Sequence, residues 1–123
     1  MIKIYHNPRC GKSRDCLAFI QNSKQEYEVI KYLETPLSFN ELEDIIRKLN
    51  IKPIELIRKN ETIWIEKYKN KDLSDIEIIQ SMVDSPILIE RPIVINGSMA
   101  VIVRPLEKLT SLFNVNLFFN KPL

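Results

Sequence analysis

The segment YHNPRCGKSR, residues 5–14, places a cysteine among several cations. Cys10 follows a short apolar run and precedes a helical pattern, so we predict that it lies at the N-terminus of a helix. Backbone N–H groups at such an end are unpaired and carry partial positive charge. Arg9, Lys12 and Arg14 add full positive charges nearby. Both effects favour thiolate over thiol, so Cys10 is predicted to be a nucleophile with a lowered pKa.

The same amide groups could hold a tetrahedral oxyanion. Gly11 follows the cysteine, and its missing side chain lets the backbone approach such a ligand. The alternative is a buried, inert cysteine, which the polar and cationic neighbours of Cys10 disfavour.

Three known motifs share part of this segment without fitting it. A phosphate-binding loop that ends in Gly11-Lys12-Ser13 needs glycine at position 6, where the chain has His6. A tyrosine phosphatase places an arginine six positions after its cysteine, and that position holds Cys16. A C-x-x-C redox motif needs a cysteine where Ser13 stands.

Cys16 is the second of the two cysteines. Six residues along a helix rise about 9 Å and turn about 120°, which puts the two Cα atoms roughly 10 Å apart. A disulfide needs a Cα separation below about 7 Å. Cys16 also shares a helical stripe with Phe19 and Ile20. We therefore predict a thiol in the hydrophobic core rather than a partner for Cys10.

The elements that must position Cys10 begin with a strand, a helix and a second strand. Residues 2–5 are apolar or alternating and rich in β-formers. A helix is predicted from Gly11 to about Ser23, and a strand over residues 27–33. This order is typical of a βαβ unit, whose two strands are parallel.

Helical patterns alone follow this unit. Ser38 with Glu41 and Ser74 with Glu77 form the S-x-x-E capping box. Short helices are predicted from Pro53 to Ile57 and, capped by Asn60, to about Tyr68. The inward faces of the two long helices are predicted to carry Leu42, Ile45, Ile46 and Leu49, and Ile76, Ile79, Met82 and Val83. The dipeptide Ser85-Pro86 ends the second one.

Two further strands are predicted at residues 92–95 and 100–103, around Asn96-Gly97, a strong hairpin signal. We expect a connection of four residues rather than two. Pro105 begins a last helix with Leu106, Leu109, Leu112 and Phe113 facing inward, and Leu117, Phe118 and Phe119 of the tail are expected to pack.

The order of elements predicts an α/β (α+β) fold: a thioredoxin-like, mixed four-stranded sheet with flanking helices and an all-helical insertion. We predict a single domain over residues 1–123, with a core at about 1–37 and 85–114 and the insertion at about 38–84. A helical block of that size could hardly hold a core of its own.

Composition bounds the class of protein. Of 123 residues, 45% are hydrophobic and 28% charged, the balance of a soluble globular domain. A net charge of +2 is too small to indicate a nucleic-acid-binding face. No apolar run approaches the roughly 20 residues of a membrane span, and no signal peptide is visible. We expect a cytoplasmic protein with a free thiol, no membrane or nucleic-acid partner and no metal site.

The segments IYHNPRCGKSR, LIRKNE, ILIERPIVI and VIVRP together resemble the ArsC family of arsenate reductases, the glutaredoxin-dependent class. The likeness spans nearly the whole chain in order. It implies a thioredoxin-like fold and a single catalytic cysteine, matched by Cys10.

The resemblance also implies an arginine trio that binds the oxyanion, matched by Arg58, Arg91 and Arg104. Guanidinium groups suit such oxygens because they are planar, permanently charged and bidentate. Thioredoxin-like folds carry a cis-proline beside the reactive cysteine, so we predict a cis bond at Arg91-Pro92.

Three further positions match the family. His6 is implied to influence the cysteine: charged, it would stabilise the thiolate, and neutral, it could accept or donate a proton. The alternative is a histidine simply tethered in a turn. Ser13 and Arg14 could hydrogen-bond the sulfur or the anion, whereas Asn7 more plausibly shapes the turn through its side chain.

The function that the resemblance implies is reduction of arsenate to arsenite through a thiolate–arsenate intermediate. Glutathione would be the co-substrate and a glutaredoxin the protein partner, with no tightly bound cofactor and a monomeric enzyme. Two alternatives stay open: a glutathione-dependent thiol/disulfide reductase, and an Spx-like regulator that binds RNA polymerase without arsenate turnover. Retention of the arginine trio disfavours the first, and Ser13 in place of a second cysteine disfavours the second.

Overall fold

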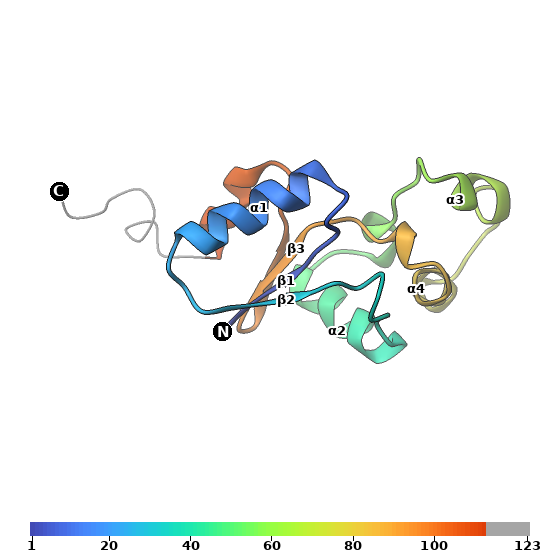
Figure 1. Ribbon diagram of the computed structural model, residues 1–123. Helices are drawn as coiled ribbons and strands as arrows, with labels where there is room; N and C mark the ends of the chain where they lie inside the picture. The colour runs from blue at the N-terminus through green and yellow to red at the C-terminus, as the bar shows by residue number, and fades with distance from the viewer. Residues whose placement is uncertain (113–123) are drawn as a thin grey trace. The chain divides into compact units, whose positions relative to one another are not determined.

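The computed structural model describes residues 1–112 (Figure 1). The chain divides into two compact units. One joins Met1–Lys31 to the segment from Arg91 onward, and the other is Tyr32–Glu90. The single domain with an insertion at about 38–84 stays a prediction.

The first unit is built on a mixed four-stranded sheet of order β2-β1-β3-β4. β1 (Ile2–Tyr5) pairs in parallel with β2 (Tyr27–Ile30) and antiparallel with β3 (Ile93–Asn96). β4 (Met99–Ile102) pairs antiparallel with β3 and closes that edge of the sheet. This confirms the predicted α/β class and the parallel βαβ unit, although β2 ends at Ile30 and not at Leu33.

α1 (Gly11–Asn22) and the 3-10 helix η3 (Leu106–Ser111) cover the core of this sheet. Figure 1 shows α1 running alongside the strands that flank it in sequence. The core contains Ile2, Ile4, Cys16, Ile20, Val94, Val103, Leu109 and Leu112. Each fully buried aliphatic side chain here stabilises the fold by about 1.5–3 kcal/mol. Burial of one face of α1 therefore fixes the helix whose first turn carries Cys10.

The β3–β4 hairpin brings two arginine–proline pairs to its ends. Asn96 pairs with Met99, so the loop is Gly97-Ser98, and the expected four-residue connection is wrong. Gly97 adopts φ +64°, a conformation that glycine reaches without a steric cost, so the tighter turn is available. The peptide bond Arg91-Pro92 is cis, as predicted, and Arg104-Pro105 is cis as well.

The second unit consists of helices in the described part of the chain. They are α2 (Phe39–Leu49), α3 (Thr62–Lys67) and α4 (Asp75–Asp84), with the 3-10 helices η1 (Pro53–Leu56) and η2 (Pro86–Leu88). Both predicted capping boxes form, at Ser38 with Glu41 and at Ser74 with Glu77. α2 buries Leu42, Ile45 and Ile46, as its stripe predicted.

Two details of the helical predictions are wrong. Asn60 does not cap α3, because the helix begins one residue later, with Glu61 at the N-cap and no side-chain bond there. Ile76 is 67% exposed. The buried face of α4 is centred on Ile78 and Met82, and Ile76 points roughly 140° away from that centre at 3.6 residues per turn.

The last predicted helix is a 3-10 helix, and its first residue Leu106 is exposed while Leu109 and Leu112 are buried. The predictions for Phe113 and for the tail lie outside the described residues. None of the helices within residues 1–112 has the length and apolar character that a membrane span requires.

Candidate functional site

Cys10 is the N-cap residue of α1, as the sequence predicts. Its backbone is extended, with φ −95° and ψ 121°, and its side chain caps no amide of the helix. The Cys10 N–H donates to the Asn7 carbonyl at 3.0 Å, and the Cys10 carbonyl accepts the first helical bond, from Arg14 N–H. The thiol is partly buried and in no disulfide. The sulfur is therefore held at the positive end of the helix dipole.

The surroundings of the Cys10 sulfur favour its ionised form. Burial is the largest single influence and raises the pKa of Cys10. The backbone amides of Ser13 and Lys12 and the side chain of Arg91, with its charge, oppose it and lower this pKa. Together they outweigh burial, so the pKa of Cys10 lies below its ordinary value. The helix amides lower this pKa as predicted, but the charge that does so is that of Arg91 and not the charges of Arg9, Lys12 and Arg14.

Arg104 connects the far end of the hairpin to the thiol. Its Nε donates to the Arg91 carbonyl oxygen at 2.6 Å, and its Nη2 lies 3.4 Å from the Cys10 sulfur. One guanidinium group thus fixes the backbone before the first cis-proline and faces the reactive atom. The two residues are separated by 94 positions in the sequence, and β1, β3 and β4 bring them together.

Arg91 is buried at 8% exposure, which is unusual for an arginine. Its Nε and Nη1 atoms have no hydrogen-bond partner among residues 1–112. A buried, unpaired guanidinium donor is costly unless something accepts from it. Beside the helix amides and Cys10, these donors make a cationic cradle suited to the oxygens of a tetrahedral anion.

His6 and Ser13 form a buried pair beneath the loop that carries Cys10. Ser13 Oγ lies 2.7 Å from His6 Nδ1 and accepts a hydrogen bond from Asn7 N–H at 3.0 Å. Burial lowers the pKa of His6, the charges of Lys31 and Arg14 lower it further, and the backbone of Ser13, as distinct from its hydroxyl, only partly offsets them. The thiolate-stabilising imidazolium is therefore the disfavoured form of His6.

The rest of the loop is shaped by local hydrogen bonds. Asn7 Oδ1 accepts from Arg9 N–H at 3.0 Å, which gives Asn7 the turn-forming role that the sequence suggests. Arg14 donates to the Pro8 carbonyl at 3.0 Å and is largely exposed. A Cβ on Gly11 would meet Arg14 Nη2 at 3.6 Å, an ordinary contact, so space alone does not demand glycine there.

Arg58 belongs to the second unit. Its backbone N–H donates to the Leu88 carbonyl at 2.7 Å, beside the bridge that pairs Ile57 with Ile89. Its guanidinium lies 3.4 Å from a carboxylate oxygen of Glu61 and 3.7 Å from one of Glu90. Sequence reasoning missed both acidic partners. The spacing of Glu61, three residues after Arg58, was the available signal.

Cys16 is fully buried in the core of the first unit, as predicted. Burial raises the pKa of its thiol to about 12. Two cysteines of one helix thus have opposite chemistry, because one sits at the helix end and the other on its apolar face. Cys16 is protonated and shielded at neutral pH.

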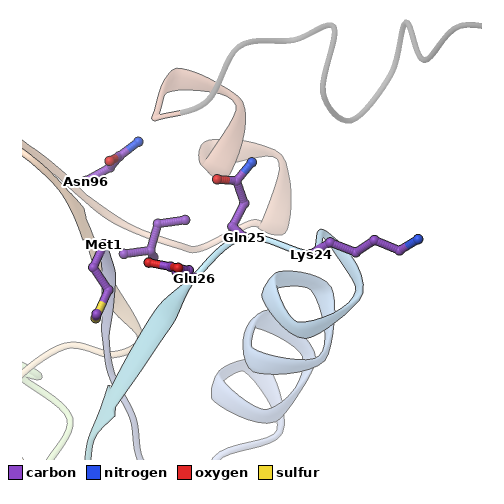
Figure 2. Close-up of a pocket in the computed structure, with 6 residues that line it drawn as sticks. Met1, Lys24, Gln25, Glu26 and Asn96 are labelled. Atoms are coloured by element: carbon purple, nitrogen blue, oxygen red, sulfur yellow. The ribbon is translucent and has the colours of Figure 1, made fainter.

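Each of the two units has a surface hollow of its own. One, of about 410 Å³, is lined by Met1, Ile2, Lys24, Gln25, Glu26 and Asn96, where β1 and β2 begin (Figure 2). The Cys10 loop follows the opposite end of β1. The second hollow, of about 250 Å³, lies along α4 between Tyr68 and Asp84. Residues 1–112 contain no cluster of three His, Cys, Asp or Glu side chains that could hold a metal ion.

Comparison with known proteins identifies the family. The family model described as "ArsC family" matches residues 5–112, and the chain therefore belongs to the ArsC family. It is 38% identical over 110 residues to a protein of Neisseria meningitidis serogroup B named arsenate reductase, covering 88% of this chain and 94% of that protein. It is 43% identical over 109 residues to the uncharacterized protein YfgD of Escherichia coli K12, covering 87% and 92%.

Solved structures agree with this membership. A structure described as arsenate reductase from Vibrio cholerae superposes with a TM-score of 0.86 at 37% identity, covering 91% of this chain and 97% of that one. The thioredoxin-like fold predicted from the order of elements is therefore confirmed.

Proposed function

We propose that this protein reduces arsenate to arsenite, with Cys10 as the attacking nucleophile. One observation carries the proposal: the sulfur of Cys10, with a lowered pKa, lies at a helix N-terminus beside Arg104 and the unpaired donors of Arg91. Membership of the ArsC family supports arsenate as the anion. A neutral disulfide substrate would gain little from two buried or half-buried cations.

The arginines bind the substrate and stabilise the charge that develops on it. Arsenate at neutral pH is a tetrahedral oxyanion with one to two negative charges, and Arg91 offers it two free donors. Arg104, with Nη2 3.4 Å from the sulfur, would lie beside both the thiolate and the bound anion and lessen the repulsion between these two negative groups. For Arg58 the assignment rests on the resemblance to the family, and its own test is the Arg58→Lys variant.

The first chemical step forms a bond between the Cys10 sulfur and As(V). One arsenate hydroxyl takes up a proton and leaves as water. The sulfur of a glutathione thiolate then attacks the Cys10 sulfur of this intermediate. As the sulfur–arsenic bond breaks, its electron pair stays on arsenic and a sulfur–sulfur bond joins Cys10 to glutathione. Arsenic is thereby reduced to As(III), two thiols have supplied the two electrons, and arsenite leaves.

The remaining step regenerates Cys10 with a thiol from outside the chain. Cys16 is buried and its thiol has a pKa of about 12, so it is a poor nucleophile toward the mixed disulfide. A glutaredoxin thiolate therefore attacks the glutathione sulfur and releases the Cys10 thiolate. On this proposal the enzyme works as a cytoplasmic monomer without a tightly bound cofactor.

The test is arsenate-dependent NADPH oxidation in an assay coupled through glutathione, glutathione reductase and glutaredoxin. We expect turnover by the wild type, none by Cys10→Ser, and none when glutaredoxin or glutathione is omitted. A parallel arm supplies thioredoxin and thioredoxin reductase instead. Turnover in that arm without glutathione would overturn the assigned electron source while leaving arsenate reduction intact.

A second substrate arm separates the reductase from its alternatives. Reduction of a small organic disulfide at a rate that exceeds arsenate turnover would overturn the assigned substrate and identify a thiol/disulfide reductase. Absence of turnover on either substrate, with Cys10 still alkylated rapidly, would overturn the enzymatic proposal in favour of a binding role.

A further inference from the structure

The Ser13 side chain joins three parts of the site, and the family resemblance suggested only that it touches the sulfur or the anion. Ser13 is fully buried in the first turn of α1. Its hydroxyl oxygen reaches back to the His6 ring and to the Asn7 backbone. It therefore connects the helix that carries the reactive amides to the loop that precedes Cys10.

The number of donors and acceptors around Ser13 Oγ determines which of the two groups, the Ser13 hydroxyl or His6 Nδ1, donates the hydrogen bond between them. A serine hydroxyl has one hydrogen and two lone pairs. Asn7 N–H occupies one lone pair of Ser13 Oγ. Within residues 1–112, the acceptor in reach of the hydroxyl hydrogen is His6 Nδ1, at 2.7 Å. A buried hydroxyl hydrogen needs an acceptor, so Nδ1 accepts and the imidazole proton sits on Nε2.

The charges that surround the imidazole support the neutral ring. Lys31, directly after β2, and Arg14, in the first turn of α1, both lower the pKa of His6, in addition to burial. No carboxylate is among the groups that shift this pKa. A proton added at Nδ1 would also break the bond that the Ser13 hydroxyl donates.

The same hydroxyl determines where the sulfur lies. Asn7 N–H is held by Ser13 Oγ, and the Asn7 carbonyl accepts from Cys10 N–H at 3.0 Å. The Ser13 backbone amide, in the first turn of α1, also lowers the pKa of Cys10. One residue thus favours the thiolate through its backbone and holds the cysteine's loop through its side chain.

We propose that Ser13 is a positioning residue, whose hydroxyl holds His6 as the neutral tautomer protonated at Nε2 and fastens the loop from His6 to Cys10 onto the first turn of α1. His6 on this assignment serves the site as a neutral ring and not as a cation next to the thiolate. The consequence for catalysis rests on the proposed function, whereas the tautomer and the loop attachment belong to the free protein.

The experiment is nitrogen NMR of the imidazole, and it needs neither arsenate nor glutathione. His6 is the one histidine of the sequence, so its two ring nitrogens give signals that need no further assignment. At neutral pH we expect an unprotonated Nδ1 and a protonated Nε2 in the wild type. Ser13→Ala should give a mixture of tautomers, and Ser13→Thr, which keeps a hydroxyl, should restore the single form.

A second readout on the same variants is the pKa of Cys10, from the pH dependence of its alkylation. Ser13→Ala should raise this pKa and slow alkylation at pH 7 several-fold, and Ser13→Thr should recover most of the rate. Ser23→Ala is the matched control, because Ser23 Oγ bonds the Ile20 carbonyl at the other end of α1. It should change neither the tautomer nor the alkylation.

An imidazolium at pH 7, or a proton on Nδ1 in the wild type, would overturn the proposal. So would a Ser13→Ala protein that keeps both the wild-type tautomer and the wild-type alkylation profile. Circular dichroism establishes first that each variant is folded, and if Ser13→Ala is not, the wild-type tautomer and Ser13→Thr still decide. A result that overturns the role of Ser13 would not contradict arsenate reduction by this protein. Absence of arsenate turnover would likewise not contradict the assigned His6 tautomer.

Discussion

Arg91 is the residue at which the structure most directly points to an anion, because its buried donors lack partners within residues 1–112. We expect Arg91→Lys to keep the charge and lose the two-pronged geometry. A hydrogen bond to a charged group is worth about 1.5–3 kcal/mol, so kcat/KM for arsenate should fall about 10- to 100-fold. Steady-state kinetics in the coupled assay measure this.

Arg47→Lys is the control for that change, since Arg47 pairs with Asp44 on the exposed side of α2. It should leave kcat/KM within error of the wild type. An Arg91→Lys enzyme with unaltered kinetics would mean that the unpaired donors of Arg91 do not bind the substrate.

Cys16 gives a second prediction at the residue scale. We expect Cys16→Ala to keep arsenate turnover close to that of the wild type, because the buried thiol takes no part in the cycle. The change should lower the free energy of unfolding by about 1 kcal/mol through lost packing. Turnover and urea denaturation of the same preparation separate the two effects. Loss of activity as complete as in Cys10→Ser would contradict the scheme in which glutathione and glutaredoxin, and not Cys16, regenerate Cys10.

The sequence predicted the chemistry of a residue where that chemistry depends on its neighbours along the chain. The lowered pKa of Cys10 followed from its place at a helix end, and the buried state of Cys16 from its helical stripe. The Arg104–Cys10 contact joins residues 94 positions apart, so no spacing in the chain could predict it. The Ser13–His6 bond needed the course of the loop, which depends on the Asn7 and Cys10 backbone bonds.

At the scale of elements, the two capping boxes make a paired test of helix stability. Ser38 and Ser74 each accept from the backbone of the glutamate three residues on, and that glutamate accepts from the serine's own N–H. Removing such a cap costs about 1 kcal/mol. We expect Ser38→Ala and Ser74→Ala each to lower the free energy of unfolding by this amount in urea denaturation. Ser98→Ala, in the exposed hairpin loop, should have no comparable effect.

The two glycines of the chain should respond in opposite ways to alanine. Gly97 has φ +64°, where an L-residue costs about 1–2 kcal/mol, so Gly97→Ala should destabilise the fold. Gly11 begins α1 without a positive φ, and a Cβ there makes an ordinary contact. Gly11→Ala should be neutral or stabilise the protein by up to about 1 kcal/mol. Equal losses in thermal unfolding would contradict the backbone assignment at Gly97.

The side-chain pattern predicted some boundaries and buried faces of the elements and failed for others. The capping boxes marked the starts of α2 and α4, because the serine and glutamate side chains that form the sequence motif themselves bond the backbone N–H groups at which the helix begins. The face of α4 was misjudged at Ile76, since two overlapping apolar stripes, one through Ile76 and one through Ile78, fit the same periodicity. Which stripe is buried depends on the neighbouring helices. The hairpin loop was misjudged because Asn96 belongs to the strand and only Gly97-Ser98 turn the chain.

For the whole molecule, Cys16 links folding to alkaline pH. Its pKa rises from an ordinary value of 9.0 to about 12 in the fold, so between these values the unfolded chain is deprotonated while the folded one is not. The folded state then binds more protons, and stability must fall as pH rises, by up to about 1.4 kcal/mol per pH unit. We expect the wild type to lose stability above pH 9 more steeply than Cys16→Ala. Parallel denaturation curves for the two proteins would contradict this.

At this scale the sequence predicted the fold class because strand, helix and hairpin signals each specified a local unit, and few topologies combine them. The family resemblance supplied the arginines, which lie far apart along the chain. The acidic partners of Arg58 were not predicted, because Glu90 approaches it through the Ile57–Ile89 bridge between distant segments.

The burial of Cys16 also determines how the protein responds to oxidation by peroxide. Peroxide converts an exposed thiolate to a sulfenic acid, and many thiol proteins rescue that state with a second cysteine of their own. Here the second thiol is sealed in the core, so a sulfenic acid on Cys10 can be capped only by a thiol from solution. The lowered pKa that makes Cys10 reactive also makes it the more easily oxidised of the two thiols. Recovery of Cys10 after peroxide exposure should therefore depend on the supply of reduced small thiols.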